Sequence, residues 1–255
     1  MVSPNVVELD GEFTHRMLHT RGVRLHVADA ASASSELILL LHGALGAWVD
    51  FKDVIAPLAS HGYHVAALDL RGYGMSDKPA HRAGSWLHIL LGDVHGAIHT
   101  LGHTTATVVG ADTGAIIARA AAARNPQVVQ RVVALPPSRG LAAYGSRVSP
   151  RLLGASTRVK DHIWRASLAA DTSPAFHNTP RFEEFLRLRT LAREIDHALP
   201  HIVETSRLRP VLPGLRRGAG VGSRAAAPDA SSWFSAAPHI EDPDRFVETL
   251  ISTLR

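Results

Sequence analysis

Runs of apolar residues alternate with amphipathic segments through the first half of the chain. The continuous apolar runs at 36–41 (ELILLL), 63–70 (YHVAALDL) and 105–110 (TATVVG) are typical of strands covered on both faces. Segments 85–101 and 113–125 carry apolar residues at helical spacing, and Ser85 is a suitable N-cap for the first of them. Strands that alternate with helices in this way predict an α/β fold with a mostly parallel sheet flanked by helices.

Three further segments extend this pattern. Residues 15–30 predict a β-hairpin that turns at Arg21-Gly22. Segment 47–60 (AWVDFKDVIAPLAS) predicts a helix, and segment 128–137 (VVQRVVALPP) predicts the next strand. The sheet is therefore expected to contain both the hairpin and a series of buried strands.

The pattern changes after Pro137. Residues 138–206 contain helical stretches and no convincing strand, which predicts a reduced helical cap inserted above the sheet. The core is expected to resume at 209–215 (RPVLPGL), although Pro213 weakens that strand because proline cannot donate to a ladder. Segment 241–255 predicts an amphipathic closing helix. The chain thus divides into three predicted parts, the first part of the core (1–137), the cap-like insertion (138–206) and the closing part of the core (207–255).

Composition restricts the chemistry. The 255 residues are 45% hydrophobic and 20% charged, which is enough to build one substantial core. The chain has no cysteine, so disulfides, thiolate chemistry and Cys-based metal sites are excluded. The 16 histidines form no convincing metal-ligand set, and we expect no metal and no cofactor. Residues 1–16 lack the apolar core of a signal peptide and no later run is long enough to span a bilayer, which favours a cytoplasmic protein.

The net charge is +4, and the basic residues are almost all arginine, since lysine occurs only at Lys52, Lys78 and Lys160. Several arginines crowd one late segment, namely Arg207, Arg209, Arg216, Arg217 and Arg224. Because no aromatic residues are interleaved with them and no nucleic-acid module accompanies them, a solvated surface is favoured over a nucleic-acid patch. We expect a small apolar or electrophilic substrate as the partner, with no nucleic acid and no membrane, while the pattern leaves the oligomeric state undetermined.

Three motifs occur in a fixed order. LLLHGALG (39–46) follows the first buried strand, LDLRGYGMSDKP (68–79) follows the second, and GADTG (110–114) lies between a strand and a helix. Together they resemble the α/β-hydrolase family over residues 15–137, and APHIEDPDRF (237–246) resembles its closing segment. In the second motif, Asp69 and Arg71 are expected to form a structural ion pair.

The third motif is a sharp strand-to-helix turn. Gly110 and Gly114 are small enough for close packing, which lifts the side chain of Asp112 above the end of the sheet. The resemblance implies that the backbone N–H groups of Thr113 and Ala44 form an oxyanion hole near that side chain. We therefore expect Asp112 at the floor of a pocket between the sheet and the insertion.

Asp112 stands where many relatives of this fold carry serine. One interpretation is an aspartate that caps the following helix. The other follows from the resemblance, because G-x-D-x-G at this turn is similar to the aspartate-nucleophile branch, the epoxide hydrolases and haloalkane dehalogenases. A carboxylate is already ionised at neutral pH and can attack a saturated carbon directly, leaving an ester on the enzyme.

Neighbouring residues favour an epoxide hydrolase over a dehalogenase. Haloalkane dehalogenases commonly place tryptophan after the nucleophile, and here that position is Thr113. Epoxide hydrolases usually supply tyrosine hydroxyls from the cap, and the insertion contains a single tyrosine, Tyr144, which is a candidate substrate contact or a packing residue. The loop at 42–46 also lacks the proline that many epoxide hydrolases carry.

The residues for ester hydrolysis are harder to find. If 241–243 is aligned with the E-x-P of the family, Ser235-Ala236 falls where Gly-His is expected, and the resemblance then implies that Ala236 stands in place of the catalytic histidine. His239 is then a possible base or a surface residue, and we expect its side chain to turn away from the pocket. No Asp or Glu occurs at 113–160 or 205–228, where the orienting acid is expected. The alternative is therefore a degenerate member that binds an apolar ligand or traps one covalent adduct.

Overall fold

The sheet contains six strands in the order β1-β2-β4-β3-β5-β6. A computed structural model of the chain describes residues 2–31, 36–80, 85–138, 153–208 and 233–255. The strands are β1 (Thr14–Thr20), β2 (Val23–Ala30), β3 (Leu37–Leu41), β4 (His64–Leu68), β5 (Ala106–Gly110) and β6 (Val129–Ala134). β2 pairs antiparallel with β1 and β4, whereas β4, β3, β5 and β6 run parallel. The α/β fold with a mostly parallel sheet is confirmed.

The burial of each strand follows its sequence pattern. Every residue of β3, β4 and β5 is buried, as their continuous apolar runs predict for strands covered on both faces. β1 buries only Leu18, because it lies at the edge of the sheet. The predicted hairpin turn is also present, since Arg21 and Gly22 adopt the positive φ angles of 49° and 76° that a two-residue hairpin loop requires.

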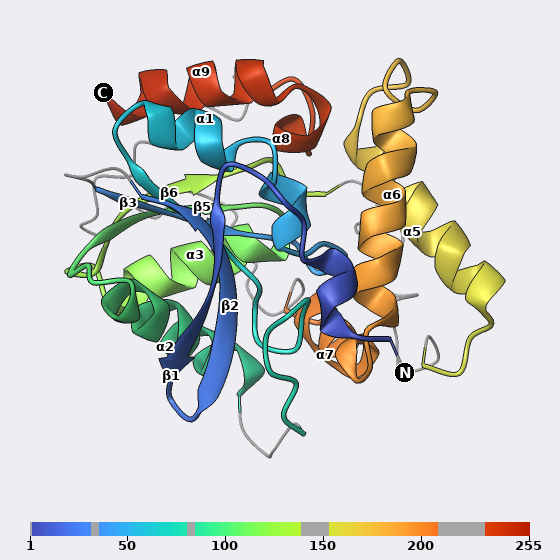
Figure 1. Ribbon diagram of the computed structural model, residues 1–255, viewed down its shortest axis with the longest axis horizontal. Coiled ribbons are helices and arrows are strands. Elements are labelled where there is room, and N and C mark those ends of the chain that lie inside the picture. Colours follow the sequence, from blue (N-terminus) through green and yellow to red (C-terminus); the bar gives the residue numbers. More distant parts are fainter. Residues whose placement is uncertain (1, 32–35, 81–84, 139–152, 209–232) are drawn as a thin grey trace.

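Helices cover both faces of the sheet (Figure 1). α1 (Ile55–Ser60) and α9 (Pro243–Leu254) lie on one face, and α2 (Trp86–Thr100) and α3 (Thr113–Arg124) lie on the other. The predicted helix at 47–60 is only partly correct, because it divides into the 3-10 segment η2 (Trp48–Phe51) and α1. All four residues of η2 are buried, so this segment is enclosed on every side and cannot present the single apolar stripe of an amphipathic helix.

Three helices from the predicted insertion stand together beside the sheet (Figure 1). They are α5 (Thr157–Asp171), α6 (Pro180–Glu194) and α7 (Ala198–Ser206), and the short segment η1 (Pro4–Val7) packs against α6. Over 153–206 the structure contains helices and no strand, as the sequence predicts. The predicted strand at 209–215 lies outside the described residues. α8 (Pro238–Glu241) precedes α9 and completes the set of described elements.

The predicted ion pair between Asp69 and Arg71 is wrong. The Asp69 carboxylate lies fully buried and accepts hydrogen bonds from His26 Nδ1 at 2.8 Å and from the backbone N–H of Trp48 at 3.0 Å. Arg71 reaches instead to α2, where its guanidinium donates to both carboxylate oxygens of Asp93 at 2.6 and 2.7 Å. The two charges belong to separate networks because one points into the core and the other spans the loop to a helix.

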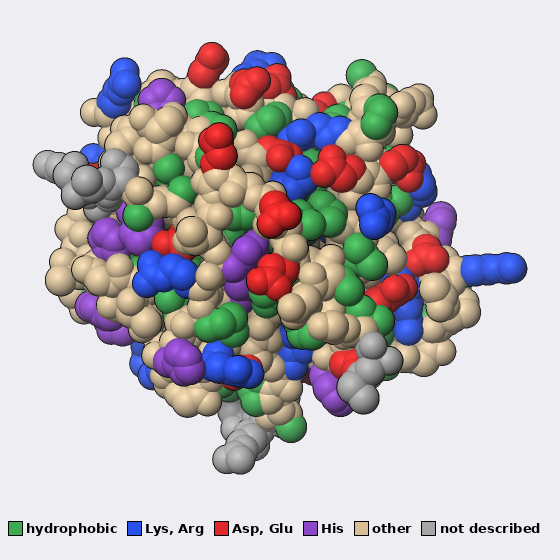
Figure 2. Space-filling model, viewed as in Figure 1, with side chains coloured by type: hydrophobic (Ala, Val, Ile, Leu, Met, Phe, Trp, Pro, Cys, Tyr) green, Lys and Arg blue, Asp and Glu red, His purple; other side chains and the backbone are tan. Residues whose placement is uncertain are grey.

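The surface carries charges of both signs. On the face in Figure 2, basic and acidic side chains are interspersed, with histidines among them. Arg207, the one residue of the late arginine group that the structure describes, donates to Glu204 at 2.7 Å. Within the described ranges, the helices are all too short or too polar to cross a membrane.

Candidate active site

The strand-to-helix turn after β5 holds Asp112 in a rare backbone conformation. Asp112 has φ 49° and ψ −113°, a region that non-glycine residues adopt only when the surrounding structure imposes it. A Cβ atom at Gly114 would collide with the carbonyl oxygens of Leu41 and His42, so α3 can approach β3 only through a glycine. The Asp112 carboxylate makes no capping hydrogen bond to α3. The geometry is therefore that of the predicted elbow, and the capping interpretation is wrong.

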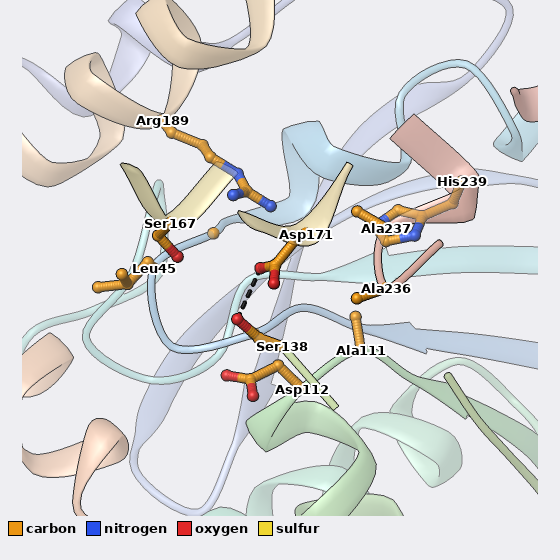
Figure 3. Close-up of a pocket in the computed structure, with 12 residues that line it drawn as sticks. Leu45, Ala111, Asp112, Ser138, Ser167, Asp171, Arg189, Ala236, Ala237 and His239 are labelled. Atoms are coloured by element: carbon orange, nitrogen blue, oxygen red, sulfur yellow. Dashed lines mark hydrogen bonds between the residues drawn. The ribbon is translucent and has the colours of Figure 1, made fainter. Parts of the chain in front are cut away.

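A small cavity lies directly over this turn (Figure 3). Its volume is about 30 Å³, which accommodates about one or two water molecules. Its walls come from the loops after β3, β5 and β6, from α5 and α6, and from the segment before α8. Asp112 is half-buried at one wall, so it lies between the sheet and the insertion helices as the sequence predicts. This is the carboxyl edge of the parallel strands, where ligands bind in open α/β sheets.

A second carboxylate enters the same cavity. Ser138, just after β6, donates its Oγ–H to Asp171 Oδ2 at 2.6 Å, and both side chains are buried. Asp171 is the last residue of α5, and its backbone carbonyl accepts the N–H groups of Ala236 and Ala237, each at 3.0 Å. The insertion thus delivers an acidic side chain to the wall formed by the closing segment.

Sequence reasoning missed Asp171. Asp171 lies between the two segments where the family usually carries the acid, 113–160 and 205–228, and α5 places its final residue in the site only through tertiary packing. A weak signal was present, because Asp171 ends a helix whose neighbouring residues are apolar or small. Nothing in that local pattern indicates which wall of the molecule the helix end faces.

A buried arginine lies above the two carboxylates (Figure 3). Arg189 on α6 donates from Nε and Nη2 to the two oxygens of Asp50, at 2.8 and 3.0 Å, in a bidentate pair. Burial alone would lower the pKa of Arg189, but the charge and hydrogen bonds of Asp50 outweigh it and raise the pKa. Asp171 and Asp112 act in the same direction, so the guanidinium stays charged and faces both.

His239 also lines the cavity, contrary to the expectation that it turns away. Its ring stacks on Phe51 with 4.6 Å between centroids and lies 5.8 Å from the Phe246 ring. Figure 3 shows it on the far side of the pocket from Asp112. Burial is the main cause that lowers the pKa of His239 to about 3, so the ring is neutral near pH 7. Among the described residues, neither ring nitrogen has a hydrogen-bond partner.

The closing segment places Ala236 in the cavity wall, at the position where the sequence alignment predicts a lost histidine. Asp112, Ala236 and His239 all line this cavity (Figure 3). Residue 236, and not only residue 239, therefore borders the cavity that Asp112 lines.

The loop after β3 is held rigidly against the elbow. His42 Nε2 accepts the N–H of Leu70 at 3.1 Å, so Nδ1 carries the proton and donates to the Gly43 carbonyl at 2.7 Å. Burial lowers the pKa of His42, which keeps this tautomer neutral. A Cβ atom at Gly43 would lie 3.0 Å from the Asp112 Cβ, so the loop backbone passes directly beside the nucleophile candidate.

The two residues predicted to form an oxyanion hole border this contact. Ala44 and Thr113 are fully buried, in the loop after β3 and at the start of α3. Their placement is compatible with donors on one side of the carboxylate, and the convergence of their N–H groups stays a prediction. Tyr144 lies outside the described residues.

Sequence comparison with known proteins consistently finds α/β hydrolases. Residues 36–158 match the model of the alpha/beta hydrolase fold. The chain is 36% identical over 120 residues to an AB hydrolase superfamily protein, YfhM, of Bacillus subtilis, covering 47% of this chain and 42% of the relative. It is 38% identical over 139 residues to epoxide hydrolase B of Mycobacterium tuberculosis, covering 53% of this chain and 39% of the relative. The matches thus span about two fifths of the length of these relatives.

Solved structures show the same fold over nearly the whole chain. An epoxide hydrolase from an endophytic Streptomyces superposes with a TM-score of 0.68 at 23% identity, covering 96% of both chains. Epoxide hydrolase A from Mycobacterium thermoresistibile superposes with a TM-score of 0.69 at 21% identity, covering 95% of this chain and 98% of the other. These structural similarities, the family model, the motifs and the sheet order all indicate the same fold. The chain therefore has the α/β-hydrolase fold, and its sequence is similar to those of epoxide hydrolases.

Proposed function

We propose that this protein is an epoxide hydrolase in which the Asp112 carboxylate attacks a carbon of the epoxide ring. The single observation that supports this most directly is the position of Asp112 at a glycine-dependent elbow, with φ 49° and its side chain bordering a cavity. A carboxylate held there needs no base before it attacks, unlike a serine hydroxyl. The sequence similarity to epoxide hydrolases supports the same reaction.

In the first step, a carboxylate oxygen of Asp112 forms a bond to the ring carbon while the carbon–oxygen bond of the ring breaks. The released oxygen takes up one proton and becomes the hydroxyl of an alkyl ester. The buried guanidinium of Arg189 faces Asp112 and stabilises negative charge that develops in the cavity. In the later hydrolysis, the N–H groups of Ala44 and Thr113 serve as the oxyanion hole in this proposal.

The size of the cavity limits the substrates that can enter the site. A cavity of about 30 Å³ is far smaller than the roughly 300 Å³ at the low end of small-molecule pockets. A substituted epoxide would therefore enter only after outward movement of α5 or α6, so these helices act as a cap over the site. We propose small, apolar epoxides, because larger ones require greater separation of the cap from the sheet.

A second function is favoured by a different observation. Ala236 stands where a histidine base is predicted, and His239 is stacked on Phe51 with its pKa lowered to about 3. A protein without an effective base would form one ester and stop, or bind an apolar ligand without reaction. Haloalkane dehalogenation is the least supported alternative, since Thr113 replaces the tryptophan that commonly holds the halide.

Incubation with an aryl epoxide in H₂¹⁸O tests the proposal. We expect diol in excess of the enzyme and ¹⁸O in the peptide that contains Asp112, because solvent oxygen enters that carboxylate at each hydrolysis. Asp112→Asn should form neither ester nor diol. Asp161→Asn is the matched control, since Asp161 is half-exposed on α5 and lies outside the cavity. A stable adduct of one equivalent supports the second function, and diol formation by Asp112→Asn contradicts both.

A further inference from the structure

The end of α5 contacts the segment in which the sequence lacks a base. The N–H groups of Ala236 and Ala237 both donate to the Asp171 carbonyl at 3.0 Å, so residue 171 is in direct contact with the segment where the histidine is predicted. The side chain of Asp171 borders the same cavity as Asp112 (Figure 3). A proton acceptor, Asp171, thus lies next to residue 236, where the histidine is expected. The insertion supplies this acceptor, and the closing segment does not.

The Asp171 carboxylate is held in a defined orientation. The hydroxyl of Ser138 donates to Oδ2 at 2.6 Å, and Ser138 also lines the cavity. Arg189 faces both Asp171 and Asp112, which reduces the repulsion of two carboxylates in one small space. The cavity between these groups has room for about one or two water molecules, so a water beside Asp112 is also beside Asp171.

From this arrangement we propose that Asp171 is the general base that activates water to hydrolyse the Asp112 ester, an inference that rests on the proposed function. Water oxygen forms a bond to the carboxyl carbon of Asp112, and one water proton passes to the Asp171 carboxylate. The tetrahedral intermediate then breaks the bond between that carbon and the alkyl oxygen. Asp171 returns its proton to the departing alkoxide, and Asp112, left as a carboxylic acid, ionises and releases the proton that balances ring opening.

His239 is the competing base, and its surroundings are less suitable. Its ring is stacked on Phe51 on the far side of the cavity from Asp112, and burial holds it neutral down to a pKa of about 3. Among the described residues, no carboxylate accepts a hydrogen bond from its ring, whereas a catalytic histidine is oriented by such a partner. Asp171, in contrast, is oriented by Ser138 and borders the same cavity as Asp112.

Asp171→Asn is a conservative test of this role. The backbone carbonyl, not the side chain, accepts the N–H groups of Ala236 and Ala237, so this docking contact remains. The amide oxygen of Asn can still accept from Ser138. The substitution removes the negative charge of the carboxylate and with it the capacity to take up a proton. Asp161→Asn removes a carboxylate from the same helix at its outer surface and is the matched control.

The experiment follows ester formation by intact mass and diol release by chromatography after mixing with an aryl epoxide. The wild-type protein and Asp161→Asn should release diol beyond one equivalent. Asp171→Asn should form one ester per chain and release diol at least about 100-fold more slowly, the usual contribution of a general base. Release by Asp171→Asn within threefold of wild type overturns the inference, as does a stable ester on the wild-type protein.

A second variant separates catalysis from structure. Asp171→Ala leaves space for a small carboxylate, and added formate should restore diol release in proportion to its concentration, which a purely structural defect would not show. His239→Phe should retain turnover, and accumulation of ester in that variant would identify His239 as the base instead. If no protein forms an ester or diol, the proposed function itself fails, which is a different outcome from turnover that is independent of Asp171.

Discussion

The guanidinium of Arg189 donates two hydrogen bonds to the carboxylate of Asp50, at 2.8 and 3.0 Å. The pair joins α6 of the insertion to η2 of the core, and both side chains are more than nine-tenths buried. Gly46 packs so closely against Asp50 that a Cβ atom there would collide with its carboxylate. The pair therefore fixes the insertion, the loop after β3 and the charge above Asp112 relative to one another.

Removing one member of this pair should destabilise the fold strongly. Arg189→Met leaves the Asp50 carboxylate buried and uncompensated, which typically costs about 3–5 kcal/mol. Chemical denaturation measures the change in the free energy of unfolding. The exposed pair between Arg165 and Glu183 is the control, and Arg165→Met should cost less than about 1 kcal/mol. Equal losses for the two arginine variants would show that the buried pair has no special role.

The two networks around the second motif should be energetically independent. A double-mutant cycle between Arg71 and Asp93 should give a coupling of about 1–3 kcal/mol, because their contact is bidentate and Asp93 is buried. A cycle between Arg71 and Asp69 should give less than about 0.5 kcal/mol, since Asp69 interacts with His26 instead. A large coupling energy between Arg71 and Asp69 would instead support the ion pair that the sequence predicted.

The elbow should tolerate no side chain at its second glycine. Gly114→Ala places a methyl group against the carbonyl oxygens of Leu41 and His42, and backbone atoms cannot yield as a flexible side chain can. We expect a loss of about 2–3 kcal/mol in unfolding free energy, the upper part of the range for overpacking. Gly154→Ala is the control, because an added Cβ there meets no atom within 4 Å. Similar stabilities of the two variants would contradict the close approach of α3 to β3.

Acid should weaken the fold through His239. In the unfolded chain His239 binds a proton near its ordinary pKa of 6.5, whereas burial keeps the folded ring neutral to a pKa of about 3. The unfolded state therefore binds more protons between these values, and stability falls as the pH is lowered from 6.5 toward 3. His239→Phe retains stacking on Phe51 and should reduce this decline by up to about 1.4 kcal/mol per pH unit.

The free energy of unfolding is measured from denaturation curves at several pH values between about 4 and 7. His88 is exposed on α2, and His88→Asn is the control that should follow the wild-type pH dependence. A decline in His239→Phe that equals that of the wild-type protein would exclude His239 as its cause.

Ala236→His should accelerate ester hydrolysis. Residue 236 borders the cavity and its N–H contacts Asp171, so an imidazole at this position would have a carboxylate nearby to orient it. We expect the first-order decay of the Asp112 ester to quicken at least about tenfold, which corresponds to roughly 1.4 kcal/mol of barrier. Intact mass measured over time gives the decay. Ala155→His, in which the new histidine is remote from the cavity lining, is the control and should leave the decay unchanged.

Much of the fold could be predicted from local sequence. The apolar runs that became β3, β4 and β5, the turn at Arg21-Gly22 and the N-cap Ser85 all follow from short-range rules of periodicity, burial and capping. The glycines around Asp112 also predicted the elbow, because only a residue without a side chain allows the backbone segments to approach so closely. The local sequence was sufficient to predict a feature wherever the contacts that form it lie close in sequence or require one residue type.

Partners that are distant in sequence were decided only by tertiary structure. Asp69 and Arg71 are near neighbours in the chain, yet each binds a residue from another element, and the sequence favoured the local pairing. Asp171 reaches the cavity because α5 packs against the segment before α8, a contact between residues 171 and 236 that no periodicity encodes. The sequence by itself determined the sheet, the elbow and Asp112 at its apex, since those depend on local geometry. Which charges meet around Asp112 was decided by packing, because charge pairing depends on distances of a few ångströms between elements far apart in the chain.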